Sequence, residues 1–266
     1  MRIGIIGTGH MGGMLATAFC EAGSPTVNIY NRNHSKAQRI QAVFPTSIHV
    51  CVNEQHVVSQ SDVTFLCTKF TDIPSIAESI RPILHPSHYV ISINSHVTLQ
   101  ELETILPCKI AKVIPSITQT ALSGILLFMG GSRLDQEDEV ELLELLSQIG
   151  VPHPIAETKT RVYSDLTSCG PAFIANWLLQ FAHAAEVHGV KEEEAEHLLA
   201  AMVEGLGRLV TKKEMTLQEI VSRVSVPGGV TEAGLHVLQG ADQHLLLRVL
   251  DATQAKQDHL ATHKTK

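Results

Sequence analysis

The chain has 266 residues, of which 44% are hydrophobic and 18% charged, as is typical of soluble globular proteins with one large domain or two ordinary ones. Its formal net charge is −7 and it contains no basic block, so the electrostatic footprint of a nucleic-acid-binding protein is absent. No apolar run reaches membrane-spanning length. We therefore expect neither a nucleic-acid partner nor a membrane partner.

The five cysteines are scattered and lack CxxC spacing, which favours reduced thiols in a cytoplasmic protein. The sequence enters a predicted strand almost at once, which leaves no room for a signal peptide. The fifteen histidines are also dispersed, and no cluster with metal-ligand spacing stands out. We expect a cytoplasmic protein without a metal site.

The first dozen residues carry the most informative motif. An apolar run over residues 3–6 predicts a buried parallel strand, and Gly7-x-Gly9-x-x-Gly12 follows it directly, with a helical pattern behind. Gly7 permits the tight turn, Gly9 lets backbone N–H groups approach a pyrophosphate, and Gly12 lets the helix pack closely on the strand. The helix N-terminus offers donors to the phosphates. The alternative is a glycine-rich turn that binds no ligand.

The next predicted strand, residues 27–30, ends at Asn31-Arg32-Asn33. An NAD site usually has an acidic residue near this position, on the ribose 2′-hydroxyl. Here the chain has Asn31, Arg32 and, slightly further on, Ser35 and Lys36. Such donors suit a 2′-phosphate, which a carboxylate would repel, so the sequence favours NADP over NAD. An exposed turn with ordinary surface charges is the alternative reading.

Further strands and helices alternate up to about residue 158. The expected helices cover residues 53–60, 73–83, 99–106 and 135–147, and the expected strands cover 63–67, 89–93, 112–114, 125–129 and an edge strand at 151–154. This alternation predicts a parallel, doubly wound sheet of the Rossmann type. Ligands bind such sheets at the carboxyl ends of the strands, where Thr68, Lys69, Asn94 and Pro115 fall.

Beyond residue 158 the alternation stops. Residues 171–188, 192–210, 217–224 and 243–259 read as helices. We therefore expect an α/β doubly wound, NADP-binding domain over residues 1–157, followed by an all-α domain over residues 158–266.

Two glycine-containing stretches, residues 165–173 and 225–234, interrupt the helical half. Each places small hydroxyl residues and a proline at an expected helix start, as an anion-binding N-terminus would. Taken alone, either stretch could equally be an ordinary helix cap.

On these motifs the chain resembles the Δ1-pyrroline-5-carboxylate reductase family over nearly its whole length. The opening Ile-Gly-Ile-Ile-Gly-Thr-Gly resembles that family's cofactor loop, and Asn31-Arg32 its NADP-reading turn. Residues 65–69 are similar to its strand that ends in lysine. Residues 167–173 are similar to its Ser-Gly-Ser-Gly-Pro-Ala-Tyr stretch, and residues 226–231 to its Ser-Pro-Gly-Gly-x-Thr signature.

The resemblance implies an enzyme that reduces the cyclic imine of pyrroline-5-carboxylate to proline with NADPH. It also implies a homodimer interlocked through the all-α dimerisation domain, commonly assembled further into rings, with the substrate at the dimer interface. Thr231 would face the imine nitrogen as the catalytic residue. The substrate residues would be Ser168, Cys169, Gly170, Pro171, Ser225, Pro227, Gly228, Gly229 and Val230. The cofactor residues would be Gly7, Thr8, Gly9, His10, Met11, Gly12, Asn31, Arg32, Lys36, Thr68, Lys69, Asn94 and Pro115.

The departures from the family gather near the expected chemistry. Val226 replaces the usual Ser, Ser168-Cys169 replaces Gly-Ser, and residues 114–118 lack the family's Asn. This pattern resembles a divergent late-competence (ComER-like) branch of the family. Three interpretations stay open: a working pyrroline-5-carboxylate reductase, a reductase of another imine or keto acid, and a nucleotide-binding regulator that has lost catalysis.

The β-hydroxyacid dehydrogenases share the expected domain plan and the Gly-x-Gly-x-Met-Gly motif. They use a lysine acid/base on the long helix after the cofactor domain, because an alcohol product requires proton movement. The corresponding expected helix, residues 171–188, contains no lysine, which argues against this class.

Overall fold

The computed structural model describes residues 1–24, 26–242 and 244–262. Internal contacts divide the chain into two compact units: Met1–Pro171 together with the segment that begins at His259, and Ala172–Asp258. The first unit therefore extends to Pro171. The sequence analysis places the domain boundary after residue 157, and that boundary stays a prediction. None of the helices in the described ranges is both long and apolar enough to cross a bilayer.

The first unit alternates strands and helices. Its main elements are β1 (Ile3–Ile6), α1 (His10–Glu21), β2 (Val27–Tyr30), α2 (His34–Val43), β3 (Ile48–Val50), α3 (Glu54–Ser59), β4 (Val63–Leu66), α4 (Ile73–Ile80), β5 (Tyr89–Ser92), α5 (Leu99–Ile105), β6 (Lys109–Ile114), β7 (Ile125–Gly130), α6 (Gln136–Ser147) and β8 (Val151–Pro154). The sequence analysis did not identify α2 and β3, which are polar and short, respectively.

The strands form one sheet in the order β3-β2-β1-β4-β5-β6-β7-β8, and β8 is an edge strand as predicted. All neighbouring pairs are parallel except β6 and β7, which are antiparallel. The expectation of a wholly parallel sheet is wrong at this point. The connection over residues 115–124 is too short for a crossover helix, and it turns back through a 3-10 segment, Ile117–Ala121, and Gly124 at φ +81°.

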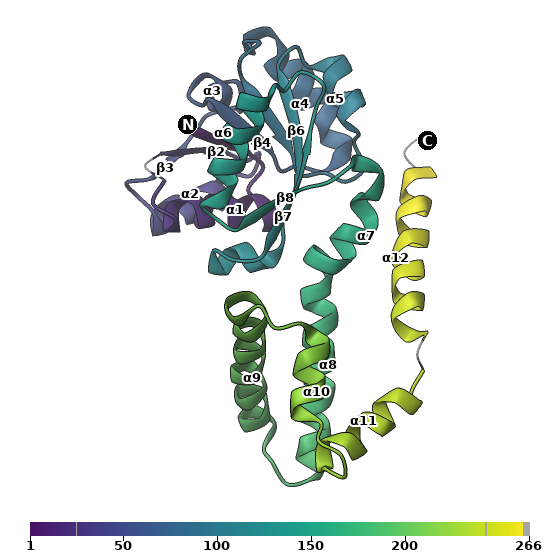
Figure 1. Cartoon of the computed structure of the whole chain (residues 1–266). Coiled ribbons are helices and arrows are strands. Elements are labelled where there is room, and N and C mark those ends of the chain that lie inside the picture. Colours follow the sequence, from purple (N-terminus) through teal and green to yellow (C-terminus); the bar gives the residue numbers. More distant parts are fainter. Residues whose placement is uncertain (25, 243, 263–266) are drawn as a thin grey trace. The chain divides into compact units, whose positions relative to one another are not determined.

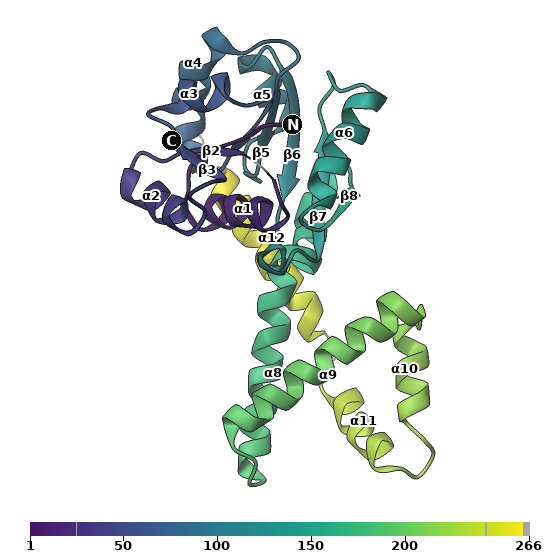
Figure 2. The same cartoon turned by 90° about the vertical axis from the view of Figure 1, so that its left-hand side faces the viewer.

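Helices cover both faces of the sheet, as the doubly wound prediction requires. One core joins α1, α2 and α6 to one face through residues such as Phe19 and Leu146, and Phe19 meets Phe65 of β4 with ring centroids 5.6 Å apart. The other core joins α3, α4 and α5 to the opposite face (Figure 1). Figure 2 shows α6 beside β7 and β8.

The order of the strands reverses between β1 and β4, because β2 and β3 lie on one side of β1 and the later strands lie on the other. The carboxyl ends of these two strands therefore border a crevice at the switch point. The glycine turn follows β1 and the Thr68-Lys69 pair follows β4, so both predicted motifs reach the same edge of the sheet.

The first helix of the helical half begins earlier than residue 171, where the sequence places it. A continuous helical run passes through α7 (Thr160–Ser164), a π-helical turn (Asp165–Cys169) and α8 (Gly170–Val187). The predicted helix over residues 171–188 is present as α8, but the expectation of a free helix N-terminus at Gly170-Pro171 is wrong, because the π turn runs directly into α8. A π turn inside a helix is common at functional sites, and it accommodates Pro171 without a break.

The remaining helices are α9 (Glu192–Lys213), α10 (Leu217–Val224), α11 (Val230–Gly240) and α12 (Leu245–Thr262). For α11 only a helix start within residues 225–234 was expected from the sequence, and no helix range was predicted. The predicted start of the last helix, Gln243, lies outside the described residues.

Large apolar side chains stay exposed along the helices of the second unit. Among its described residues only Ala182 and Ala195 are buried apolar side chains. The exposed ones include Ile174, Trp177, Phe181, Leu198, Met202, Val221 and Val237. Large apolar side chains exposed in this number favour an interaction face on this unit.

Candidate functional site

The three glycines of the turn after β1 have distinct structural roles. Gly7 has φ +96°, and a Cβ there would lie 2.7 Å from the Cys67 carbonyl oxygen. A Cβ on Gly12 would lie only 1.9 Å from the Gly7 carbonyl oxygen, so α1 can approach β1 only with glycine at this position. At Gly9 no heavy atom of the described residues lies within 4 Å of the Cβ position. The turn is therefore tight on the protein side and open where a ligand would approach.

A cavity of about 480 Å³ lies at the carboxyl ends of β1, β2 and β4. It brings together many of the predicted cofactor residues, from three separate segments of the chain. Those that line it are Gly7, Gly9, Asn31, Arg32, Lys36, Thr68 and Lys69. We call this cavity the dinucleotide crevice.

Other predicted cofactor residues border the crevice or support it. The Thr8 backbone N–H donates to Asn31 Oδ1 over 3.0 Å, and Asn31 Nδ2 donates to the Asn33 carbonyl oxygen over 3.0 Å. Asn31 therefore holds the glycine turn and the end of β2 together. His10 is exposed at the first position of α1 and Met11 is half-buried beside it.

Two hydroxyls at the crevice edge are buried without a hydrogen-bond partner among the described residues: Thr8 Oγ1 and Thr68 Oγ1. A buried hydroxyl that lacks a partner costs free energy, and a bound ligand can supply that partner. Together with the open approach at Gly9 and the cations Arg32 and Lys36, they fit the phosphates of a dinucleotide.

The crevice also contains two carboxylates that the sequence analysis did not identify, Glu54 and Asp72. Arg32 Nη2 lies 3.2 Å from Asp72 Oδ2. Neither carboxylate lies in the segment directly after β2. Glu54 is the first residue of α3, and Asp72 is the last residue of the 3-10 turn Phe70–Asp72 after β4. No local motif near Arg32 could have indicated them.

A hydrogen bond links the predicted residue at the end of β5 to the crevice, and another links the predicted residue at the end of β6 to the first substrate motif. Asn94 Nδ2 donates to the Thr68 carbonyl oxygen over 3.5 Å. Pro115 is buried directly after β6, and its carbonyl oxygen accepts a hydrogen bond from Ser168 Oγ over 2.9 Å. The first predicted substrate motif is therefore tied to the carboxyl end of β6.

A charged pair directly precedes that motif, with Arg161 in α7 and Asp165 at the first position of the π turn. Arg161 Nη2 lies 2.6 Å from Asp165 Oδ1 and 3.2 Å from Cys169 Sγ. Asp165 is buried and Arg161 is half-buried. The i, i+4 spacing of the two charges was the available signal for this pair, and the sequence analysis did not use it.

An ion pair between a buried lysine and a partly exposed glutamate connects the same region to the sheet. Lys112 Nζ, in the middle of β6, lies 2.6 Å from Glu157 Oε1. Glu157 also accepts a hydrogen bond from the Leu99 N–H at the start of α5 over 3.1 Å. A lysine inside an apolar strand was the signal for a buried partner. The pair connects β6, α5 and the beginning of the helical run.

The second predicted substrate motif lies in the second unit. Ser225 is the C-cap of α10, Gly228 has φ +75°, and Gly229 is the N-cap of α11. This confirms the predicted helix start. One of the expected N–H donors is already occupied, since Gly228 N–H donates to Glu232 Oε2 over 2.8 Å.

Around that turn, the other predicted substrate residues differ in exposure. Pro227 is exposed, and the Val230 side chain is 92% exposed at the first position of α11. Thr231 is half-buried in the first turn of that helix. The substrate and catalytic roles of these residues stay predictions.

Among the described residues, one group has metal-ligating types close together: His183, Glu186 and Glu192, whose ligand atoms lie within 4.8 Å of one another. His183 Nδ1 lies 3.2 Å from Glu192 Oε1, and both side chains are well exposed. An exposed ion pair between α8 and α9 accounts for this arrangement, and the expectation that the protein has no metal site stays a prediction.

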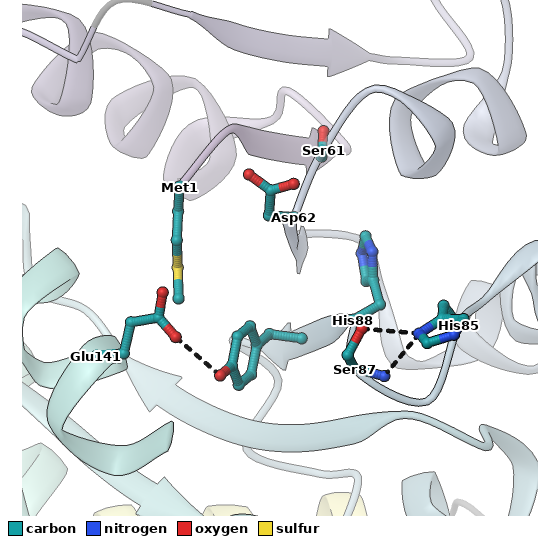
Figure 3. A pocket seen from close by; sticks show the side chains of 8 residues that line it. Met1, Ser61, Asp62, His85, Ser87, His88 and Glu141 are labelled. Atoms are coloured by element: carbon teal, nitrogen blue, oxygen red, sulfur yellow. Dashed lines mark hydrogen bonds between the residues drawn. The ribbon is translucent and has the colours of Figure 1, made fainter. Parts of the chain in front are cut away.

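A separate cavity of about 360 Å³ lies at the opposite edge of the sheet, among Met1, Asp62, His88 and Glu141 (Figure 3). Burial lowers the pKa of His88 to about 4, and the ring lies 2.9 Å from Thr64 Oγ1. Tyr89 Oη donates to Glu141 Oε2 over 3.0 Å. This cavity lies at the amino ends of the strands, whereas doubly wound sheets bind their ligands at the carboxyl ends.

Two family models match the chain. That for pyrroline-5-carboxylate reductase dimerisation covers residues 157–260, and that for NADP oxidoreductase, coenzyme F420-dependent, covers residues 2–96. The chain is 36% identical to ComE operon protein 4 of Bacillus subtilis, over 96% of this chain and 95% of that protein. It is 27% identical to pyrroline-5-carboxylate reductase 3 of the same organism, over 97% and 96%.

Solved structures show the same fold. A pyrroline-5-carboxylate reductase from Coxiella burnetii superposes with a TM-score of 0.89 at 23% identity, over 98% of both chains. The glycine turn, the crevice at the switch point and the helical unit together define a two-domain, NADP-dependent oxidoreductase class. Within that class, the chain belongs to the pyrroline-5-carboxylate reductase family. The predictions of family and fold class are confirmed, and the NADP prediction is confirmed for the kind of domain.

Proposed function

We propose that this protein reduces Δ1-pyrroline-5-carboxylate to L-proline by hydride transfer from NADPH, and so serves proline biosynthesis. The observation that carries this proposal is the Ser168 Oγ to Pro115 carbonyl bond of 2.9 Å. It fixes the family's first substrate motif to the strand end that borders the cofactor edge of the sheet. The two family matches, to an NADP oxidoreductase domain and to a reductase dimerisation domain, support the same reaction.

The residues of the crevice suit NADPH. Backbone N–H groups around Gly9, with the hydroxyls of Thr8 and Thr68, would hold the pyrophosphate. Arg32 and Lys36 would meet the 2′-phosphate, and Asn94 and Pro115 would border the nicotinamide. When bound, the cofactor supplies the hydride, and these side chains orient it and exclude water.

The substrate side needs alignment more than a strong acid, because a protonated imine is already electrophilic. The iminium N–H would donate to the Thr231 hydroxyl, which holds the ring in one orientation. The substrate carboxylate would meet backbone N–H groups near Gly229 at the start of α11, where the helix dipole favours an anion. Ser168 and Cys169 are among the predicted substrate residues of the first unit.

We further propose that the protein is a cytoplasmic homodimer. A second copy of the chain would cover the exposed apolar faces of α8 and α9, since such faces are costly in water. All five cysteines are free, which fits a reducing compartment. Multi-angle light scattering should give the mass of the dimer, or a whole multiple of the dimer mass. The mass of a single chain at micromolar protein concentration would contradict this part of the proposal.

A second candidate function is favoured by the charged π turn and by the similarity to ComE operon protein 4. Ser168-Cys169 departs from the family's Gly-Ser pattern at the substrate motif, and the Arg161 guanidinium lies 3.2 Å from Cys169 Sγ. A protein so altered could bind NADP as a regulator, or could reduce another imine or keto acid.

The deciding experiment follows NADPH oxidation by the purified protein with pyrroline-5-carboxylate and identifies the product. Saturable oxidation with proline formed in equal amount is the expected result. NADPH binding without turnover of pyrroline-5-carboxylate, but with turnover of another imine or keto acid, would reassign the substrate. Binding without turnover of any of these compounds would favour the regulator.

A further inference from the structure

The carboxylates in the dinucleotide crevice bear on which cofactor the protein prefers. Glu54 and Asp72 line the same cavity as Arg32 and Lys36. Both enter from elements that follow other strands, α3 and the turn after β4. The crevice is therefore of mixed charge, although the segment directly after β2 carries only amides, hydroxyls and cations.

Asp72 makes a direct contact with the predicted NADP-reading arginine. Its Oδ2 lies 3.2 Å from Arg32 Nη2, with the Arg32 side chain 84% exposed and that of Asp72 29% exposed. The Asp72 backbone is held at the start of α4, where its carbonyl oxygen accepts a hydrogen bond from Ser75 Oγ over 2.9 Å. The Asp72 carboxylate is therefore the less exposed and better anchored member of the pair, and the Arg32 guanidinium is the more exposed member.

We propose that Asp72 is a specificity-determining residue that weakens the preference of this crevice for NADPH over NADH. A 2′-phosphate must take the Arg32 guanidinium away from the Asp72 carboxylate, and it then lies close to that negative charge. A ribose 2′-hydroxyl need not break the Arg32–Asp72 pair and is not repelled by the carboxylate, because it is neutral and can donate a hydrogen bond to it. The inference rests on the proposed function only in that the crevice must take a dinucleotide.

Glu54 adds a second negative charge in the same cavity. It is half-buried at the first position of α3, and its charge is among the causes, after burial, that raise the pKa of Tyr30 at the end of β2. The electrostatic influence of Glu54 thus reaches the strand end that carries the predicted 2′-phosphate contacts. Its effect on the two cofactors has the same sign as that of Asp72.

The test measures the dissociation constants of NADP+ and NAD+ by calorimetry on the full-length protein at low and high salt. Asp72→Asn keeps the shape of the side chain and removes its charge. The expected result is a rise of about fivefold in the ratio of the NAD+ constant to the NADP+ constant, from the size of exposed charge interactions. The rise should shrink at high salt because the charges are screened.

Glu78→Gln is the matched control, since Glu78 is an exposed carboxylate on α4 that should leave the ratio at its wild-type value. A double variant with Arg32→Ala supplies the second readout: Asp72→Asn should change the ratio less when the guanidinium is missing. A ratio that is unchanged or lowered by Asp72→Asn alone would overturn the inference. A wild-type protein that binds neither nucleotide would instead overturn the proposed function.

Discussion

Ser168 Oγ donates a hydrogen bond to the Pro115 carbonyl oxygen over 2.9 Å, and this contact joins the π turn of the helical run to the carboxyl end of β6. Both residues were expected near the chemistry for different reasons, one as a substrate residue and one as a cofactor residue. The bond lies within the first unit, so the position of the substrate motif relative to the sheet is part of that unit's own fold.

Replacement of Ser168 by Ala should remove this bond. The Pro115 carbonyl would then be a buried acceptor without its partner, which costs about 1 kcal/mol of unfolding free energy, as urea denaturation can measure. We also expect kcat/KM for the imine to fall while NADP+ affinity is kept. Ser147→Ala, which removes the bond from Ser147 Oγ to Glu144 O at the exposed end of α6, is the control. Equal effects of the two variants on kcat/KM would contradict a positioning role for Ser168.

Two glycines of the turn after β1 should have different roles, Gly9 in cofactor binding and Gly12 in folding. Ala at Gly9 has open space and a φ of −72°, so Gly9→Ala should fold normally and weaken NADP+ binding at least about tenfold, because the methyl group occupies the phosphate position. Ala at Gly12 meets the Gly7 carbonyl oxygen at 1.9 Å, so Gly12→Ala should destabilise the fold by several kcal/mol, of the order of severe overpacking.

Gly13→Ala serves as the control for both variants, since its Cβ would make an ordinary 3.5 Å contact with Ile40 Cδ1. Thermal unfolding and nucleotide titration on the three proteins give the two readouts. Tight NADP+ binding by Gly9→Ala would argue that the turn does not hold the pyrophosphate.

His88 should make stability depend on pH. Burial lowers its folded-state pKa from 6.5 to about 4, so between these values the unfolded chain binds a proton that the folded chain does not. Stability from this residue is therefore present above about pH 6.5 and is lost as the pH falls toward 4, by up to about 3 kcal/mol.

His88→Gln should flatten this part of the stability curve, even though it lowers stability at neutral pH by loss of the contact with Thr64 Oγ1. The exposed His85 on the same loop supplies the control variant, His85→Gln. Urea denaturation at several pH values measures the slope for each protein. An unchanged slope in His88→Gln would show that His88 is not held neutral by the fold.

Thr231 should matter for turnover rather than for cofactor binding. Thr231→Ala removes the hydroxyl proposed to hold the imine nitrogen, and we expect turnover to fall about 10–100-fold through lost positioning. Thr231→Ser keeps the hydroxyl and should recover most of the rate. Steady-state kinetics with a parallel NADP+ titration make the comparison, and a wild-type rate in Thr231→Ala would remove this residue from the mechanism.

The sequence predicted what depends on local patterns. Gly7, Gly9 and Gly12 between an apolar run and a helix indicated β1, α1 and the crevice, and these roles follow from backbone geometry alone. The direction of β7 was not predicted, because it depends on a connection of residues 115–124 that reverses the chain without a recognisable turn motif.

Contacts between distant segments could not be predicted either, because they depend on how the strands are ordered in the sheet. Asp72 meets Arg32 only because β4 and β2 flank β1 in the sheet, and no spacing in the sequence expresses that. The glycine and proline at residues 170–171 suggested a helix start, yet the π turn before them lets the helix continue. Helical propensity rules penalise such residues, whereas tertiary packing can retain them.

The central claim is that a hydride passes from NADPH to the imine carbon of pyrroline-5-carboxylate on this protein. The most direct measurement supplies NADPH deuterated at the transferable position of its nicotinamide and examines the product by mass spectrometry. The account predicts proline that carries one deuterium, bonded to the former imine carbon. Protein that binds the labelled NADPH tightly and yields no labelled proline would contradict it.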